Sequence, residues 1–377
     1  MRQVTQGDIA KALGLSRQTV ALVIGKTDSP LRKHLNPETV RRIQEKAAEM
    51  GYSANYNARM LTQRRSNLII LLNFNLYNER TGKQIYHLGQ LAHAAGYDLR
   101  VIEAQWWVEN AQALIEQIVS FRPEGVIMEG TSSVLFDPHH VEELTRRGIP
   151  IVSFAGADIE GIPTVRYDTR ESTRQITEHA IRSGRRKLAL LQANRDTWQR
   201  QQKIDGFRDA LREAGAGQPE EYGLDYSFLN QSTGVQSVIL FDPSRDGGFP
   251  DFNLKVAAIE RVLGSSEIPD ALLCTNDHYG MAALKVCHQR EIAVPDTLSV
   301  SGCDGMEYGA MAGISLTSIR LPIEAMSEAS LKMLITRITK EGGSQSSSEK
   351  KLFPCEVIWR ESTDPVEQSS LLSSQVS

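Results

Sequence analysis

Apolar residues recur at helical spacing in three short stretches near the start of the chain. Residues 5–25 carry two of them, on either side of Gly14, which permits a tight turn. Thr5 and Ser16 stand where helix N-caps are expected, and a third helix begins at Asn36-Pro37. This pattern predicts a three-helix head with a helix-turn-helix, although the spacing alone also fits a plain helical hairpin. Its expected core positions are Ile9, Ala10, Leu13, Val20, Val23, Ile24, Val40, Ile43, Ala47 and Met50.

From residue 67 the pattern changes to short, continuous apolar runs that alternate with helical stretches. Runs of this kind predict buried parallel strands with helices on both faces of the sheet. Helical periods stand out at 85–95 and 283–287. We therefore expect an α/β body of two doubly wound parallel sheets around a cleft. The expected strands are 68–72, 99–102, 125–128, 149–154, 188–191, 238–241, 271–274 and 298–301.

Charge divides the chain at the same place as the hydrophobic pattern. Residues 1–66 hold twelve Lys and Arg against five Asp and Glu, whereas the whole chain has a net charge of −4. A basic head on an acidic body suits a head that meets phosphate groups. A solvated basic face is the alternative, and the helix-turn-helix favours nucleic acid over it.

Composition removes several classes of function. No apolar run is long enough to span a bilayer, and the first residues are polar. The four cysteines lack metal-site spacing, so we expect reduced thiols and a cytoplasmic protein. We find no phosphate loop, nucleophile elbow or H-E-x-x-H motif, and the pair His139-His140 is expected at the surface. The sequence therefore predicts neither an enzyme nor a bound cofactor or metal.

Polar segments separate and follow these parts. Residues 52–66 are basic and too short to form a stable helix alone, so they predict a linker that folds on a surface. The Gly- and Ser-rich stretch 341–350 predicts a flexible loop, and 363–377 predicts a disordered tail.

Several motifs resemble the LacI/GalR (lactose-repressor/galactose-repressor) family of bacterial transcription regulators. They are Asn57-Ala-Arg-Met-Leu61, Val165-Arg-Tyr-Asp168, Thr275-Asn-Asp277, Leu298-Ser-Val-Ser-Gly-Cys-Asp304 and Trp359-Arg-Glu-Ser362. Their order and spacing along nearly the whole chain carry the resemblance. It implies a helix-turn-helix head on a two-lobed body like the periplasmic binding proteins.

The resemblance also implies domain boundaries and a homodimer. The chain would cross between the lobes near Asp168, Pro295 and Leu321. The implied parts are a DNA-binding domain 1–51, a hinge helix or linker 52–66, an effector-binding and dimerisation body 67–362 and the tail. Within the body, the N-lobe would comprise about 67–166 and 296–321, and the C-lobe about 167–295 and 322–362.

The first turn of the second helix is expected to read DNA bases. Arg17 can pair with guanine and Gln18 with adenine, while Leu22 offers only apolar contact. Leu61 matches the leucine that the family inserts into the minor groove at the centre of a near-palindromic operator. We expect DNA contacts from Thr5, Ser16, Arg17, Gln18, Thr19, Leu22, Tyr52, Asn55, Arg59 and Leu61.

Ligands of open α/β sheets lie beyond the carboxyl ends of the strands. Carboxylates, amides and aromatic rings follow those ends here and suit the hydroxyl groups and C–H faces of a sugar. Each aromatic ring taken singly is more often a core residue. Asp304 and Asn276 also match effector contacts of the family. The expected effector residues are Phe74, Tyr77, Trp107, Glu129, Lys203, Asp242, Asn276, Asp277 and Asp304.

Two departures from the family leave the effector class open. Lys203 replaces a clamping arginine and suggests a ligand with an acidic group, or else a structural ion pair. Gly305 replaces the second acid of an Asp-Asp pair, and the long segment 220–253 would lie beside the cleft. A purine or nucleoside stacked on Phe74 or Trp107 is the alternative to a sugar.

The resulting hypothesis is a DNA-binding regulator, expected to be a repressor, that a small molecule controls allosterically. A solute-binding receptor shares the body fold and is the remote alternative. Whether the effector releases or promotes DNA binding cannot be read from these residues.

Overall fold

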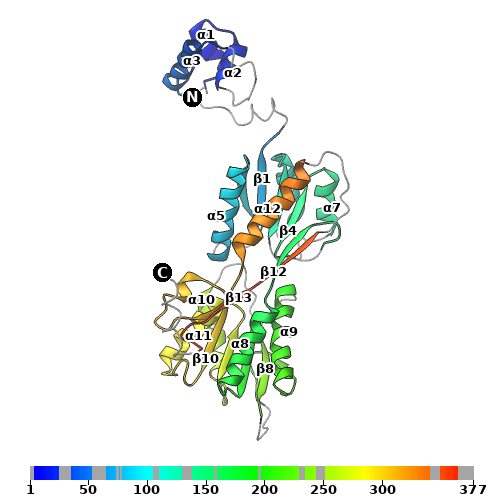
Figure 1. Cartoon of the computed structure of the whole chain (residues 1–377), viewed down its shortest axis with the longest axis vertical. Coiled ribbons are helices and arrows are strands. Elements are labelled where there is room, and N and C mark those ends of the chain that lie inside the picture. The colour runs from blue at the N-terminus through cyan, green and yellow to red at the C-terminus, as the bar shows by residue number, and fades with distance from the viewer. Residues whose placement is uncertain are drawn as a thin grey trace, which may run out of the picture. The chain divides into compact units, whose positions relative to one another are not determined.

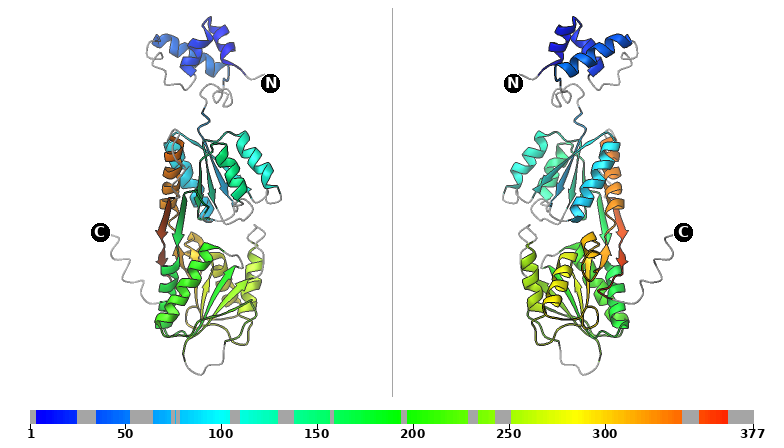
Figure 2. Two further views of the ribbon diagram at one scale, coloured as in Figure 1. Left: turned by 90° about the vertical axis from the view of Figure 1, so that its right-hand side faces the viewer. Right: turned by 90° about the vertical axis from the view of Figure 1, so that its left-hand side faces the viewer.

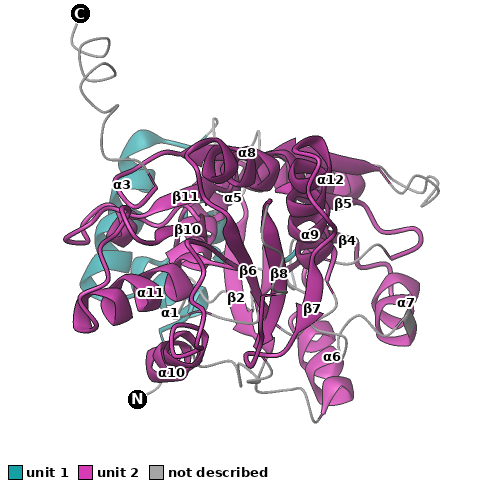
Figure 3. Ribbon diagram, turned by 90° about the horizontal axis from the view of Figure 1, so that it is seen from below, with its two compact units in different colours: residues 1–66 teal, residues 67–377 magenta. Residues whose placement is uncertain are grey.

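The computed structural model describes residues 4–24, 35–52, 65–73, 76, 79–104, 110–129, 138–156, 159–193, 197–228, 234–242, 251–339 and 349–363. The chain forms two compact units, residues 1–66 and residues 67–377 (Figure 3). No helix among the described residues is long and apolar enough to cross a membrane.

The head contains the three helices that its apolar spacing predicts. They are α1 (Gln6–Leu13), α2 (Arg17–Ile24) and α3 (Pro37–Glu49). Thr5 and Asp8 form a capping box at the start of α1, and Gly14 ends that helix with a φ of 64°. Asn36 caps α3 with Pro37 at its first position. The buried core consists of Ile9, Ala10, Val20, Val23, Ile43 and Ala47.

The first lobe of the body is a parallel sheet with strand order β12-β5-β4-β3-β1-β2. Its strands are β1 (Leu68–Asn73), β2 (Asp98–Glu103), β3 (Gly125–Glu129), β4 (Ile151–Phe154), β5 (Thr164–Asp168) and β12 (Lys350–Pro354). The helices α5 (Glu79–Ala94), α6 (Ala111–Ser120), α7 (Pro138–Arg146) and α12 (Ile323–Thr339) accompany it (Figure 1). β1 is buried along its whole length, as expected for a central strand with both faces covered.

The second lobe has strand order β13-β11-β10-β9-β6-β8-β7, with only β13 antiparallel to its neighbour among the described pairs. Its strands are β6 (Lys187–Ala193), β7 (Glu220–Tyr222), β8 (Gln236–Asp242), β9 (Ala271–Cys274), β10 (Ser299–Asp304), β11 (Thr317–Arg320) and β13 (Glu356–Ile358). Helices α8 (Arg170–Arg182), α9 (Trp198–Glu213), α10 (Phe252–Val262) and α11 (Asp277–Gln289) cover its two faces (Figure 2).

The lobe boundaries differ from the sequence-based expectation. Residues 296–321 were expected in the N-lobe, but β10 and β11 pair with each other inside the second sheet. Residues 322–362 were expected in the C-lobe, but α12 packs on α5, β3 and β4 of the first lobe. The chain crosses between the sheets after β5, after β11 and between β12 and β13. The crossing expected near Pro295 is therefore wrong, because Pro295 only leads from α11 into β10.

Two other segments differ in part from the sequence-based expectation. The segment 220–253 was expected beside the cleft; its described part supplies the edge strand β7 and the neighbouring strand β8, which reaches the carboxyl edge of the sheet only at Asp242. Between these strands, Leu224, Tyr226 and Phe228 pack into the core of the second lobe. Thr363 was placed in the tail, yet it is 8% exposed and its hydroxyl is hydrogen-bonded to that of Thr317 at 2.7 Å. Residues 340–348 and 364–377 lie outside the described residues.

Candidate functional site

The start of α2 is exposed on the surface of the head. The hydroxyl of Ser16 accepts the N–H of Thr19 at 3.0 Å, which caps this helix and fixes its direction. Arg17 and Gln18, the next two residues, are exposed, and Leu22 is half-buried on the same helix. The first turn of α2 therefore presents the two side chains that the sequence assigns to base recognition.

Two other predicted DNA contacts, Thr5 and Tyr52, make hydrogen bonds within the head. Thr5 both accepts the N–H of Asp8 and donates its hydroxyl to the Asp8 carboxylate, at 2.7 Å. Tyr52 packs partly buried against the head core, and its N–H donates to the carbonyl of Ala47 at 2.8 Å. The predicted contacts Asn55, Arg59 and Leu61 lie outside the described residues.

The two sheets of the body face each other with their carboxyl ends. The side chain of Gln199, in the first turn of α9, donates to the carbonyl of Ala155, which follows β4. The N–H of Glu307 in the second lobe donates to the carboxylate of Glu79 at the start of α5. The Arg166 guanidinium lies 4.9 Å from the ring centroid of Trp198. We call the region between these contacts the lobe junction.

Glu129 lies at the first-lobe side of the junction, where its carboxylate is already paired. It is 2% exposed, accepts a hydrogen bond from the Asn73 amide and forms an ion pair with Arg80 at 2.9 Å. Burial alone would lower the pKa of Arg80, but the charges of Glu129 and Asp304 raise it on balance. Arg80 therefore lies near an acid of each lobe, since Glu129 ends β3 and Asp304 ends β10.

Sequence reasoning missed Arg80, although a signal was present. The N-terminal end of a helix carries partial positive charge, which favours acidic residues in the first turn. An arginine in this turn is therefore expected to have an acidic partner. Arg80 is the second residue of α5 and follows the loop after the first buried strand.

Asp304 ends β10 in an unusual backbone conformation. Its φ is 125°, and Gly305 follows with a φ of 67°. A Cβ on Gly305 would lie 2.8 Å from the Cα of Arg320, which is too close for any side chain. With this backbone, a second acid directly after Asp304 could be accommodated only if Arg320 shifted. Asp304 itself is half-buried.

Asp242 and Asp277 direct their carboxylates into the second lobe. Asp242 is 2% exposed and accepts the hydroxyl of Tyr279 at 2.6 Å. Asp277 is fully buried and accepts the N–H of Met306 at 2.7 Å and the hydroxyl of Ser318 at 2.5 Å. Burial, and then the charge of Asp304, raise the pKa of Asp277 to about 7. These contacts tie α11 to β8, β11 and the segment after β10, and so position the edge of the sheet.

Lys203 and Asn276 lie at the carboxyl edge of the second sheet. Lys203 reaches from α9 to the carbonyl of Thr275, directly after β9. Asn276 caps α11, where its side-chain oxygen accepts the N–H of Tyr279 at 3.1 Å. The structure thus brings Lys203, Asn276 and Asp304 to one edge, with Glu129 on the opposite lobe. Phe74, Tyr77 and Trp107 lie outside the described residues.

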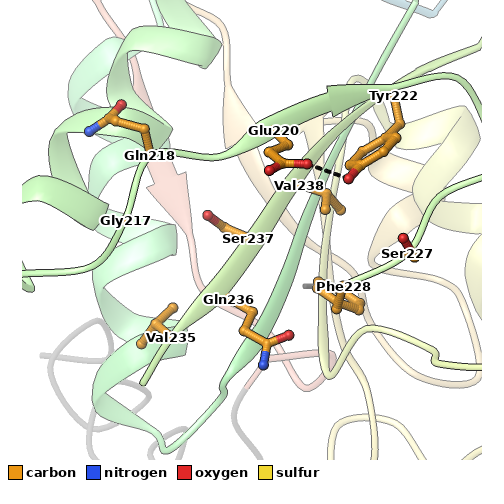
Figure 4. Close-up of a pocket in the computed structure, with 10 residues that line it drawn as sticks. All are labelled: Gly217, Gln218, Glu220, Tyr222, Ser227, Phe228, Val235, Gln236, Ser237 and Val238. Carbon is orange, nitrogen blue, oxygen red and sulfur yellow. Dashed lines mark hydrogen bonds between the residues drawn. The ribbon is translucent and has the colours of Figure 1, made fainter. Parts of the chain in front are cut away.

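A separate small pocket lies away from the junction (Figure 4). Its lining includes Gly217, Tyr222, Phe228 and Gln236, and the hydroxyl of Tyr222 donates to Glu220 on the same strand, β7. Gln236 begins β8, whereas Asp242 ends that strand, so this pocket lies at the opposite end of the sheet from the junction. It contains none of the predicted effector residues. Among the described residues no cluster of His, Cys, Asp and Glu could hold a metal ion.

Two family models match the body of the chain. A "periplasmic binding protein-like domain" matches residues 177–363. "Periplasmic binding proteins and sugar binding domain of LacI family" matches residues 83–224. The HTH-type transcriptional regulator DegA of Bacillus subtilis (strain 168) is 23% identical over 360 residues, which cover 95% of this chain and 98% of that relative. The HTH-type transcriptional regulator CelR of Thermobifida fusca is 26% identical over 349 residues, covering 90% and 93%.

Solved structures share the fold over the head and the body. The lac repressor dimer bound to operator and the anti-inducer ONPF has a TM-score of 0.75 at 19% identity, covering 96% of this chain and 99% of that one. A complex of the transcriptional regulator CelR with cellobiose has a TM-score of 0.63 at 21% identity, covering 96% and 100%. With a helix-turn-helix head, two facing α/β lobes and regulators matched along almost their whole length, the chain belongs to the LacI/GalR family of bacterial transcription regulators.

Proposed function

We propose that this chain binds near-palindromic operator DNA through its head, as a homodimer in the cytoplasm, and that a small molecule in the lobe junction controls the affinity. The observation that carries the proposal is the pairing of an exposed Arg17-Gln18 turn with a polar, two-sided junction. The lac repressor structure supports the DNA partner and the dimer, because that relative is a dimer on its operator.

A sugar or sugar derivative is the proposed effector. CelR, a relative of similar length, is solved with cellobiose. In this chain, Asp304 and Asn276 bring a carboxylate and an amide to the junction, and such groups bind hydroxyls. The alternative of a stacked purine or nucleoside depended on Phe74 or Trp107, and neither is among the described residues.

The ligand would act through the relative position of the lobes. Arg80 and Glu129 belong to the first lobe and Asp304 to the second, so a molecule that contacts both sets favours one arrangement of the lobes. The ligand can change the DNA affinity only if it binds two arrangements of the lobes with different affinities. The hinge helix 55–63, with Leu61 in the minor groove, is the proposed link to the operator.

Gln18→Ala is expected to relax base preference at one position of each half-site, by about 1–3 kcal/mol, because Gln18 is exposed at the turn that faces bases. Selection of duplexes from a randomised library measures this preference position by position. Gln44→Ala, an exposed glutamine on α3, is the matched control and should leave the selected motif unchanged. A uniform loss across all sequences for Gln18→Ala would show that Gln18 does not read bases.

Asp304→Asn is expected to remove most of the thermal stabilisation that an effector gives to the wild type. A ligand stabilises the folded protein by mass action, and asparagine tolerates the positive φ of this position while lacking the charge. Thermal unfolding in the presence of sugars, sugar acids and nucleosides measures the effect. Asp296→Asn, an exposed aspartate before β10, is the control. Equal stabilisation of Asp304→Asn and wild type would remove Asp304 from the site.

A further inference from the structure

Lys203 is a buried cation that forms no ion pair with a described carboxylate. It lies on α9, is 9% exposed, and its ammonium donates to the backbone carbonyl of Thr275. No carboxylate among the described residues lies within ion-pair distance of it. The sequence left a structural ion pair open for Lys203, and the described contacts do not contain one. A buried ammonium has three donors and is costly without a charge partner.

Two cysteine thiols lie near Lys203, and neither carries a negative charge. Cys303 lies close enough for the ammonium to lower the pKa of its thiol, yet burial raises that pKa more, to about 12. Burial likewise raises the pKa of Cys355, the second thiol near Lys203. Both thiols are therefore neutral at physiological pH, and neither can balance the lysine.

Gln192 adds a second unused donor at the same edge. It is the penultimate residue of β6 and is 1% exposed. Its side-chain oxygen accepts the hydroxyl of Thr275 at 3.3 Å, which leaves its NH₂ group without a partner. Thr275 thus connects Gln192 and Lys203, through its hydroxyl and its carbonyl respectively. Buried amide donors are normally satisfied, so an unused one marks a place for an acceptor.

We infer that Lys203 and Gln192 form a subsite for an anionic group of the effector, so that the ligand is a sugar acid or a sugar phosphate. This inference rests on the proposed function, because it takes the lobe junction as the effector site. Asn276 offers a third donor group at the edge, because the cap of α11 uses only its side-chain oxygen. A carboxylate or phosphate accepts several N–H donors at once and neutralises the lysine.

Matched pairs of compounds test the charge requirement. The affinities for glucuronate, gluconate and ribose 5-phosphate are compared with those for glucose and ribose, by thermal unfolding and by titration. An acid or phosphate should bind about tenfold more tightly than its neutral parent, or better. Lys203→Met should abolish the difference, whereas Lys332→Met, an exposed lysine on α12, should preserve it. The carboxylate and phosphate arms distinguish the two anion classes.

Gln192→Glu tests the subsite without any ligand. The substitution keeps the shape of the side chain and puts a carboxylate among the donors. It should raise the unfolding temperature of the unliganded protein and block the acidic ligands. A lowered unfolding temperature would overturn the inference, because it would mean that the new charge has no cation to pair with. Neutral sugars that bind as tightly as the acids would also overturn the inference, while leaving the proposed function intact. A ligand that binds without changing the DNA affinity would instead refute the proposed function.

Discussion

Arg80→Met is expected to destabilise the body by about 3–5 kcal/mol, because it leaves a buried carboxylate without its cation. Glu129 is 2% exposed, and its described hydrogen-bond and ion-pair partners include Asn73 and Arg80, the latter at 2.9 Å. Methionine keeps most of the length of the side chain, so lost packing contributes little. Urea unfolding of the purified chain measures the change.

A double variant separates the charge effect from a general defect at this position. Glu129→Gln in the Arg80→Met background removes the unpaired charge and should recover much of the lost stability. Arg146→Met is the control, because Arg146 and Glu142 form an exposed pair at 3.8 Å that should contribute less than about 1 kcal/mol. If Arg80→Met costs no more than this control, the Arg80–Glu129 pair is not a structural element of the junction.

Removal of residues 1–66 is expected to lower the affinity for a selected operator by about three orders of magnitude or more, down to non-specific binding or less. The head is a compact unit with its own buried core, and it holds Arg17 and Gln18. It also carries the excess of basic residues, whereas the remainder is acidic. Titration of labelled duplex at several salt concentrations measures affinity and the number of phosphate contacts.

The shortened chain also reports on the body. Residues 67–377 form a separate compact unit, so their unfolding temperature should change little when the head is removed. The same effector should still stabilise them. Operator binding that persists without residues 1–66 would show that the helix-turn-helix is not the DNA-binding element.

Much of the fold could be read from local patterns. Continuous apolar runs predicted β1, β3 and β9 because these strands are buried on both faces. The capping pattern likewise predicted α1 and α3. These features depend on residues close together in the sequence, so a single chain is enough to recognise them.

Features that depend on long-range pairing could not be read in this way. β12 and β13 are short and half-exposed, and each pairs with a strand far away in the chain. Their pairing decides to which lobe the end of the chain belongs, which is why the lobe boundaries were wrong. β5 mixes polar and apolar residues and was noticed only as a family motif.

The candidate site was only partly predictable for the same reason. Rules about strand ends found Glu129, Asn276 and Asp304, and the family resemblance added Lys203 on α9. They did not show that Asp242 and Asp277 are engaged by Tyr279, Ser318 and the Met306 backbone. Arg80 and Gln192 were missed because their significance lies in partners, or a missing partner, on other elements.

Control of the head by the lobe junction is tested most directly by the operator affinity of the full chain with and without a ligand. An operator is first selected from a random library, and a ligand is chosen by its stabilisation of the wild type and not of Asp304→Asn. Saturating ligand is expected to change the apparent Kd of the full chain for its operator by about 5- to 150-fold, in either direction. An apparent Kd that stays the same at saturating ligand would contradict the claim that the lobe junction controls the head.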